Sequence, residues 1–403
     1  DALFHTHPIE IPVHHPSEIG EIFDEVSYSK GASIIRMLAD YLGEKDFRDG
    51  LRHYLKKHSY SNTVTEDLWH SFEKVSRKPV AKIMRNWTSK PGYPVVKARI
   101  WKGKVNFSQS RFFASPISAK KASKKNKNKT RWEIPITFKG NKANFGETGF
   151  FRTAYSKELL GKLRTPVEKK LLSPRDRLGI IRDLFALAEA GTVPTTDALE
   201  FLRAYKGEDN YTVWLEIALG LGRLEQLLRK NVSLDRLLDK LMLELFSPLV
   251  KKLGWEKKKT DSHTDSLLRS LSVSRAGRSG DKKIIIEAKR KFAKIQKGIQ
   301  INPDILGAVY TIVATWGGMK EYKMLIKKYK KETLHEEKNR IGNALGDFPD
   351  PRTLKLACEF AFSKNVRPQD TISIISSVGA NPAGRDIWLN FVKKNWKTFV
   401  SRY

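Results

Sequence analysis

The sequence predicts a mainly α-helical protein with a small β-sandwich between two helical parts. Over most of the chain, apolar residues recur three or four positions apart, which is typical of amphipathic helices. Between about residues 93 and 160 they alternate with polar residues, as in half-buried strands. After Ser173, short helices follow one another across short connections. This succession predicts an α-helical solenoid of stacked hairpins, although no clear sequence repeat is visible.

Four helices are predicted before the alternating region. Residues 1–15 are extended and punctuated by proline, and Pro16 suits the first position of a helix that ends at Gly43. A second helix covers about residues 45–57. A third opens with a capping-box pattern, in which Thr63 and Glu66 would satisfy each other's backbone amides. A fourth, over about residues 80–87, ends before the two prolines and the glycine of residues 91–94.

The alternating region predicts strands over 96–100 and 105–107, another over 132–138, and a further pair within 141–155. A run of lysines lies between two of these strands. Six of the ten residues from Lys120 to Lys129 are lysine and none is acidic. Like charges at this density repel one another and resist packing, so the run is predicted as a protruding hairpin loop.

The rest of the chain predicts only helices. Ser173 and Pro174 suit the N-cap and first positions of a helix that ends at Gly191. The helices that follow are predicted over 196–205, 211–228, 234–253, 281–297, 304–316, 320–331, 336–345, 351–362, 370–378 and 385–397.

Composition places the chain among globular proteins. With 403 residues, 40% of them hydrophobic, it is long enough for two to four domains. No uncharged apolar run reaches the roughly 18 residues of a transmembrane helix, and no signal peptide is visible, so no membrane association is expected. Cys358 is the only cysteine, which excludes an intrachain disulfide and favours a reducing, cytoplasmic location. Its apolar neighbours predict a buried core residue.

The net charge of +31 creates a field that attracts anionic partners. Lysines also recur over 251–259, 282–297 and 320–331, where they are mixed with leucine, isoleucine and glutamate. That mixture is typical of the solvated faces of amphipathic helices. A generally basic surface is the simpler interpretation, and a dedicated nucleic-acid face is not expected.

Six ordered segments resemble the M1 family of zinc aminopeptidases, of the tricorn-interacting-factor or puromycin-sensitive type. The most specific is Phe-Asp-Glu-Val-Ser-Tyr-Ser-Lys-Gly at 23–31, with Met37, which resembles the family's tyrosine-bearing helix. The other segments are 7–10, 86–88 followed by 92–96, 149–152 followed by Tyr155, 176–178 with Asp183, and 381–385 with Trp388, Asn395 and Trp396. The resemblance spreads over essentially the whole chain.

The resemblance implies three domains. Residues 1–92 would form the C-terminal helical part of a thermolysin-like catalytic domain, and residues 93–165 a β-sandwich domain. Residues 166–403 would form an incomplete α-helical C-terminal domain of the HEAT or armadillo type.

The zinc motif of that family is not found in this sequence. The family's site needs two histidines one helical turn apart, in His-Glu-x-x-His, and a further glutamate. The nearest match is residues 335–339, where Asn339 stands in place of the second histidine. The Gly-x-Met-Glu-Asn segment that holds the substrate's amino terminus is missing too. Both are expected upstream of Asp1 and the family's last helices beyond Tyr403, so we interpret the chain as an internal piece without metal ligands.

Tyr28 is the predicted catalytic residue. By composition alone it would be an aromatic residue on the buried stripe of a helix. The resemblance instead implies that its phenol hydrogen-bonds the oxyanion formed when zinc-bound water attacks a peptide carbonyl. Lys30 and Gly31 are expected to position the helix through packing or local hydrogen bonds.

Other candidates are weaker. Four histidines lie close together near the N-terminus: His5, His7, His14 and His15. No carboxylate or cysteine completes a regular ligand spacing, so structural or exposed histidines are favoured over a metal site. Asp370 and Arg385 are candidates for contact with the far end of a peptide, because the helical domain encloses the substrate cavity in the family. No other substrate-binding residue is assigned.

The favoured function is a portion of a zinc-dependent aminopeptidase that hydrolyses N-terminal residues from peptides. This chain would supply Tyr28 and the substrate-enclosing helical domain, and a missing segment or a zinc-bearing partner chain would supply zinc. The chain alone is then expected to be inactive, and a partner would cover a large apolar surface around Tyr28. The alternative is a non-catalytic module that recruits anionic partners or nucleic acid through Lys120–Lys129. Salt-sensitive binding that is lost when this loop is neutralised would favour the module.

Overall fold

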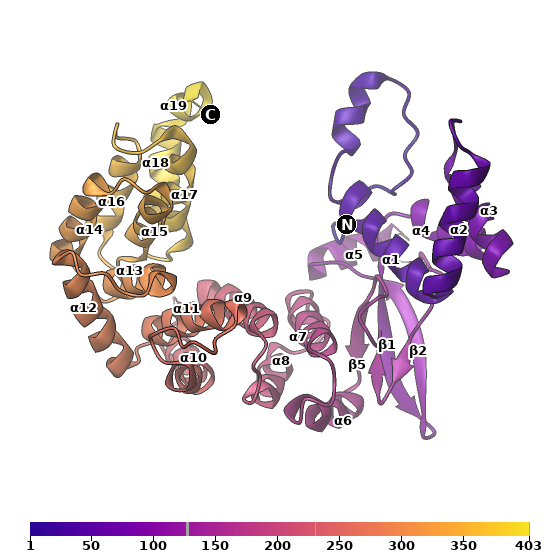
Figure 1. Cartoon of the computed structure of the whole chain (residues 1–403), viewed down its shortest axis with the longest axis horizontal. Helices are drawn as coiled ribbons and strands as arrows, with labels where there is room; N and C mark the ends of the chain where they lie inside the picture. Colours follow the sequence, from indigo (N-terminus) through magenta and orange to yellow (C-terminus); the bar gives the residue numbers. More distant parts are fainter. Residues whose placement is uncertain (126–128, 230, 403) are drawn as a thin grey trace. The chain divides into compact units, whose positions relative to one another are not determined.

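The structure is a computed structural model that describes residues 1–125, 129–229 and 231–402. The chain divides into two compact units, Asp1–Glu208 and Asp209–Tyr403. Helices dominate both units, and every strand of the described residues belongs to the first unit (Figure 1). The predicted mainly helical fold with small sheets is confirmed. The predicted boundaries at 92/93 and 165/166 stay predictions.

The first unit begins with an interrupted helix. The single helix predicted from Pro16 to Gly43 is wrong, because the segment forms three elements: a 3₁₀-helix η1 (Pro16–Ile22), a π-helix η2 (Val26–Lys30) and helix α1 (Gly31–Leu42). Residues 23–25 separate η1 from η2. Gly43 ends α1 with φ at +88°, a conformation that favours glycine.

Helices α2 (Glu44–Lys57), α3 (Thr65–Ser76) and α4 (Val80–Thr88) follow where they were predicted. The predicted capping box is out of register by one residue. The amide of Val64, not that of Thr63, donates to the side chain of Asp67 over 3.0 Å. Thr63 instead bonds the hydroxyl of Tyr54 through its own hydroxyl at 2.7 Å, which takes it away from the helix end.

These helices share a core of buried aromatic and aliphatic residues. Phe47 and Phe72 stack with their ring centroids 5.1 Å apart, and a Cβ atom on Gly50 would lie only 2.4 Å from the Phe72 ring. Glycine at position 50 therefore allows α2 and α3 to approach closely. Trp87 is fully buried in the same core and packs against Trp132 of the next region.

Two small sheets occupy the region predicted as a β-sandwich. Strands β1 (Pro94–Trp101) and β2 (Lys104–Arg111) form an antiparallel hairpin, and β5 (Arg152–Tyr155) joins β1 in parallel, so the strand order is β2-β1-β5. Lys102 and Gly103 both have positive φ, as a two-residue hairpin turn requires. The second sheet pairs β3 (Phe138–Lys139) with β4 (Lys142–Ala143).

The strand predicted over 132–138 is wrong except at Phe138. A side chain replaces the neighbouring strand, because the amide group of Gln109 accepts from the Trp132 amide and donates to the Trp132 carbonyl, both at 2.8 Å. The indole of Trp87 donates to the carbonyl of Glu133 at 2.8 Å. The alternation of apolar and polar residues over 132–138 therefore reflects the burial of Trp132, and it does not indicate regular strand pairing.

The lysine run was predicted as a loop, and this is wrong for its first part. Helix α5 (Pro116–Lys124), with Ser115 as its N-cap, begins before the run and includes its residues 120–124. Ala122 anchors the helix, because it is fully buried in a small apolar cluster with Phe4 and Phe113. Lys121 also lies over the Phe4 ring, 4.6 Å from its centroid. Residues 126–128 of the run lie outside the described residues.

The first unit ends in helices α6 (Lys157–Glu168), α7 (Pro174–Glu189) and α8 (Thr195–Phe201) and a 3₁₀-helix η3 (Leu202–Tyr205). Ser173 caps α7 as predicted, accepting from the amide of Asp176 at 3.1 Å. Helix α6 was not predicted, and it contains Pro166 in its last turn, a residue that normally signals a helix end.

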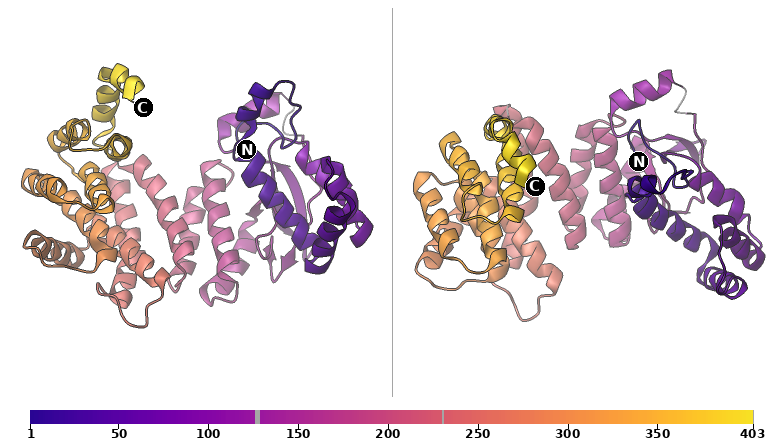
Figure 2. Two further views of the ribbon diagram at one scale, coloured as in Figure 1. Left: turned by 45° about the horizontal axis from the view of Figure 1, so that its top comes forward. Right: turned by 90° about the horizontal axis from the view of Figure 1, so that it is seen from above.

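Helices joined by loops are the regular structure of the second unit over its described residues (Figure 1, Figure 2). Its elements are α9 (Tyr211–Leu228), α10 (Val232–Leu253), α11 (His263–Arg278), α12 (Lys282–Gln296), η4 (Pro303–Ile305), α13 (Leu306–Thr315), α14 (Met319–Lys331), α15 (His335–Ala344), η5 (Leu345–Asp347), α16 (Pro351–Ala361), α17 (Pro368–Ala380), α18 (Arg385–Lys394) and α19 (Trp396–Arg402). Every helix predicted for this unit has a counterpart, but the one predicted over 385–397 is divided at Asn395 into α18 and α19. Helix α11 was missed because polar residues interrupt its buried face, among them Ser266, Arg269 and Ser272.

Candidate catalytic tyrosine site

Tyr28 lies in a short π-helix and not in a regular α-helix. The carbonyl of Glu25 accepts from the amide of Ser29 at 3.0 Å and from the amide of Lys30 at 3.1 Å. The second of these bonds spans five residues and defines the π turn η2. Single π turns are rare in proteins, and those that do occur often lie at functional sites.

Asp24 begins this turn and ties it to the N-terminal segment. One carboxylate oxygen accepts from the amides of Val26 at 2.9 Å and Ser27 at 3.0 Å. The other lies 2.8 Å from Nε2 of His7, whose Nδ1 lies 2.7 Å from the carbonyl oxygen of Pro8. The bond from the Ser27 amide, followed by the bond to His7, lowers the pKa of Asp24 below its usual value. Asp24 therefore stays ionised near neutral pH and keeps both contacts.

Lys30 anchors the other end of the turn. Its side chain is buried, and its Nζ atom donates to the carbonyls of Lys90 and Gly92 at 3.0 Å each and pairs with the Asp1 carboxylate at 3.0 Å. Burial, with the nearby charge of Arg111, lowers the pKa of Lys30 to about 8. We expected Lys30 to position this segment through packing or local hydrogen bonds, and it does so through partners far away in the sequence.

Gly31 does not show the packing role that we expected. A Cβ atom at this position would meet nothing within 4 Å, and Gly31 simply starts α1. Gly92 is the glycine that the anchor requires. Its φ is +85°, and a Cβ atom there would lie 2.5 Å from Nε of Arg111.

The phenol of Tyr28 faces solvent. The side chain is 62% exposed, so the prediction from composition of a buried helical stripe is wrong at this position. The Tyr28 ring lies 5.7 Å from that of Phe23, which is 63% exposed. Within the described ranges, no group hydrogen-bonds to the Tyr28 hydroxyl. A hydroxyl donor is thus presented to solvent on a turn whose two ends are fixed by Asp24 and Lys30.

The N-terminal segment is held against α4 by a second pair of contacts. Glu10 donates its amide to the carbonyl of Thr88 at 3.1 Å, and its carboxylate accepts from the Thr88 hydroxyl at 2.9 Å. The segment at 7–10 and the segment at 86–88 therefore meet in the structure. Together with His7 and Asp24, these contacts position the segment that precedes Tyr28.

A cavity of about 340 Å³ lies beside the turn. Its lining includes Lys30, Ser33, Arg36, Tyr93, Glu147 and Arg182. Tyr28 is not among the lining residues, so its phenol does not open into this space. Burial raises the pKa of Glu147, although the Lys142 ammonium lies 2.6 Å from its carboxylate. Glu147 also pairs with Arg182 at 3.1 Å, so its carboxylate is engaged in ion pairs at the wall of the cavity.

Three of the four N-terminal histidines have separate side-chain contacts. His7 bonds Asp24, and His15 caps η1, with its Nδ1 accepting from the amide of Ser17 at 3.2 Å. His5 packs its ring edge-on against Phe4. In the part of the chain that the structure describes, no three His, Cys, Asp or Glu side chains form a group able to hold a metal ion. The residues present therefore do not fit a zinc site.

The remaining candidates have structural partners. Asp370 is buried and pairs with Arg367 at 2.7 Å, and Arg385 donates to the carbonyl of Gln226 at 2.9 Å. In residues 335–339, Glu337 accepts from the Tyr310 hydroxyl and pairs with an arginine one turn later. Cys358 is fully buried as predicted, and burial raises its pKa to about 11.

Sequence reasoning missed the residues that fix the turn, namely Asp24, Asp1 and Gly92. The available signal was weak: an aspartate two or three residues before unpaired amides is a common cap, and a glycine between two prolines marks an unusual backbone.

Among the described residues, no helix is both long enough and apolar enough to cross a membrane.

Comparison with known proteins shows the family to which the chain belongs. Residues 1–87 match the model of the peptidase family M1 domain, and residues 141–403 match that of the ERAP1-like C-terminal domain. The second match covers more than half of the chain. The chain therefore belongs to the M1 aminopeptidase family, whose members are metallo-aminopeptidases that use zinc.

Individual relatives are similar over nearly the whole chain. It is 33% identical to aminopeptidase M1-A of Oryza sativa subsp. japonica and to aminopeptidase M1 of Arabidopsis thaliana, over 98% of its length in each case. It is 31% identical to the puromycin-sensitive aminopeptidase of Caenorhabditis elegans over its full length. The matched regions cover 48%, 49% and 46% of these proteins. The chain thus spans about half the length of the curated relatives that it matches.

Proposed function

We propose that this chain forms the tyrosine-bearing and helical parts of a zinc-dependent aminopeptidase that hydrolyses N-terminal residues from peptides. Family membership and the names of the relatives support this function. The observation that carries it is the state of Tyr28, an exposed phenol that has no hydrogen-bond partner among the described residues and that sits on a turn fixed at both ends.

In this proposal the Tyr28 hydroxyl donates a hydrogen bond to the carbonyl oxygen of the scissile peptide bond as that oxygen gains negative charge. A donor that is already in place stabilises the developing charge without a further cost of reorganisation. The contacts of Asp24 and Lys30 supply that fixed placement. In this role Tyr28 only donates a hydrogen bond, so its phenol does not have to lose its proton.

The metal comes from outside this chain in our proposal. Zinc would activate the attacking water in the assembled enzyme, and a separate segment or a partner chain would hold it. The exposed apolar side chains along the N-terminal segment support a covering partner: Leu3, Val13, Ile19 and Phe23. The single buried cysteine is consistent with a cytoplasmic location, which we also propose.

The alternative of a basic binding module has weaker support. It relied on a protruding loop over Lys120–Lys129, whereas Lys120, Lys121 and Lys124 lie on helix α5, which is anchored by buried Ala122.

The test uses the complete enzyme purified from its native source, with zinc analysis and an aminoacyl-arylamide assay. We expect Tyr28→Phe to lower kcat by about 10²–10³-fold, with KM and zinc content little changed. Tyr60→Phe is the matched control, because Tyr60 is a fully exposed tyrosine on a loop of the same unit. Full activity of Tyr28→Phe would refute the catalytic role, and native material without zinc or aminopeptidase activity would refute the proposed function.

A further inference from the structure

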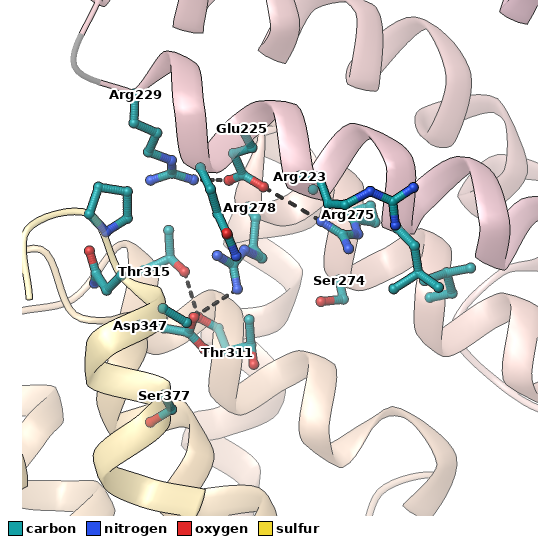
Figure 3. Close-up of a pocket in the computed structure, with 17 residues that line it drawn as sticks. Arg223, Glu225, Arg229, Ser274, Arg275, Arg278, Thr311, Thr315, Asp347 and Ser377 are labelled. Carbon is teal, nitrogen blue, oxygen red and sulfur yellow. Dashed lines mark hydrogen bonds and ion pairs between the residues drawn. The ribbon is translucent and has the colours of Figure 1, made fainter. Parts of the chain in front are cut away.

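The second unit contains a polar cavity of about 470 Å³ lined by four of its helices (Figure 3). Helices α9 and α11 contribute arginines, α13 contributes Thr311 and Thr315, and α17 contributes Ser377. Asp347 of η5 also lies in the wall. A neighbouring cavity of about 420 Å³ shares Arg229, Thr315 and Asp347 with it, so the hollow extends beyond one pocket.

Positive charge exceeds negative charge in this lining. Four arginines are present: Arg223, Arg229, Arg275 and Arg278. Two carboxylates, Glu225 and Asp347, face them, which leaves an excess of two positive charges among the described lining residues. Cavities walled by one sign of charge concentrate ions of the opposite sign.

Both carboxylates are already engaged by arginine. Glu225 pairs with Arg229 through one oxygen, and its other oxygen lies 3.6 Å from Nη1 of Arg275. Asp347 lies 2.7 Å from Nη1 of Arg278 (Figure 3). Although burial opposes ionisation, Arg278 and Arg229 hold the pKa of Glu225 below its usual value, so this carboxylate stays charged and stays paired.

Arg275 and Arg278 retain unused donor capacity. The distance from Arg275 to Glu225 is longer than a hydrogen bond, and burial lowers the pKa of Arg275. The Nε atom of Arg278 is buried and has no hydrogen-bond partner in the described part of the chain. A buried donor atom without a partner is costly. The side chains of Arg275 and Arg278 are 21% and 30% exposed, so their other N–H groups can reach an anion in the cavity.

The backbone around these arginines is shaped to hold them. A Cβ atom on Gly222 would lie 3.3 Å from a terminal nitrogen of Arg275, so glycine lets this guanidinium lie against α9. Asn381 donates to the carbonyls of Gly346 and Phe348 at 2.8 and 2.9 Å, on the two sides of Asp347. Asp347, and Arg278 through it, are therefore fixed in place.

We propose that this cavity binds a small ligand with a doubly charged oxyanion group, a phosphate or a dicarboxylate, through Arg275 and Arg278. Guanidinium groups match both kinds of anion with paired hydrogen bonds. Ser274 adds a hydroxyl donor, whereas the hydroxyls of Thr315 and Ser377 already donate to the backbone carbonyls of Thr311 and Ile374. The volume suits a small organic ligand. This inference concerns a site apart from Tyr28 and does not depend on the proposed function.

Calorimetric titration of the full chain tests the proposal, with inorganic phosphate, pyrophosphate and succinate as probes at a constant ionic strength. We expect saturable one-to-one binding of at least one probe. Arg275→Gln should weaken that binding by about tenfold or more, and Arg275→Lys, which keeps the charge but loses the paired donors, by less. Arg290→Gln on α12 is the control, because Arg290 is exposed and pairs only with Glu287 among the described residues.

The titrations with phosphate or pyrophosphate and with succinate identify the class of ligand. Binding of phosphate and pyrophosphate alone would support a phosphate ligand, and binding of succinate alone would support a dicarboxylate. The proposal fails if no probe binds below about 10 mM. Circular dichroism checks that the Arg275 variants are folded. The proposal also fails if folded Arg275→Gln or Arg275→Lys binds a probe as tightly as Arg290→Gln does, since the probe would then bind to the lysine-rich surface.

Discussion

The Nζ atom of Lys30 lies 3.0 Å from the carbonyl oxygen of Gly92, so a loop 62 residues further along the chain holds the tyrosine-bearing turn. The same atom pairs with the Asp1 carboxylate at 3.0 Å, and Asp1 in turn accepts from the Gly92 amide at 2.9 Å. These three residues form a closed set of contacts beneath η2. The position of Tyr28 therefore depends on residues that lie at both ends of the first ninety positions.

This buried lysine predicts a pH dependence of stability. The pKa of Lys30 is about 8 in the folded chain and 10.5 as a model value, so between these values the folded state binds fewer protons than the unfolded state. The free energy of unfolding should then rise with pH above 8, by up to about 1.4 kcal/mol per pH unit. Urea unfolding between pH 8 and 9.5 measures the slope. Lys30→Met should flatten it, and an equal slope in this variant would contradict the assignment.

Asp24→Asn should loosen the turn that presents Tyr28. The substitution removes the charge that accepts from Val26 and Ser27 and that contacts His7. We expect the amides of Ser29 and Lys30 to exchange hydrogen faster in the chain alone. In the complete enzyme we expect kcat to fall by roughly 10-fold to 10²-fold, because a displaced donor stabilises the transition state less well. Asp49→Asn on α2 serves as control, and unchanged exchange in Asp24→Asn would show that the cap is dispensable.

Glu208→Gln should strongly destabilise the first unit. The Glu208 carboxylate accepts from Nε of Arg177 at 2.6 Å and from Nη2 at 2.8 Å, and both side chains are almost fully buried. Removal of the Glu208 charge breaks this buried ion pair, which costs about 3–5 kcal/mol. Urea unfolding measures the loss. Glu200→Gln, at an exposed position on α8, should change stability by less than about 0.5 kcal/mol, and a similar effect of both variants would contradict the prediction.

Gly346→Ala should destabilise the second unit. A Cβ atom there would lie 2.4 Å from the backbone carbon of Ser377, so η5 would have to move away from α17. Forced repacking of this kind costs about 1–3 kcal/mol. Gly307→Ala on α13 is the control, because its added Cβ would make only an ordinary contact at 3.9 Å. Thermal unfolding should separate the two variants, and equal midpoints would show that the close approach is relaxed in solution.

Regular amphipathic helices were the most predictable part of the fold. Helix α9 has the predicted bounds, because its apolar residues follow the helical period and Asn210 caps its start. Helix α11 was not predictable in this way, since polar residues lie on its buried face. Arg269 pairs with Asp261 in the preceding loop, and the Ser272 hydroxyl donates to the carbonyl of Arg269 within the helix. Helix α5 was hidden for a different reason: one buried alanine, Ala122, outweighs the repulsion between its lysines.

The candidate site was predictable only in part. Tyr28 was found through its neighbours, residues 23–31, and not through hydrophobic periodicity, which would have buried it. The partners that fix the turn depend on contacts between distant segments, such as Lys30 with Gly92 and His7 with Asp24. Short sequence patterns carry no information on such contacts. The arginine cavity was invisible for the same reason, because its residues come from four separate helices.

The π turn also sets the direction in which Tyr28 points. A bond that spans five residues takes up one more residue than a turn of α1 does, and each residue of an α-helix rotates the chain by about 100°. Loss of Ser27 or Ser29 would bring this stretch into helical phase with α1 and rotate the phenol by roughly that angle relative to its anchor. The direction of the phenol is therefore encoded in the length of this stretch as well as in its residue types, and a single-residue deletion would misdirect a tyrosine that is still present.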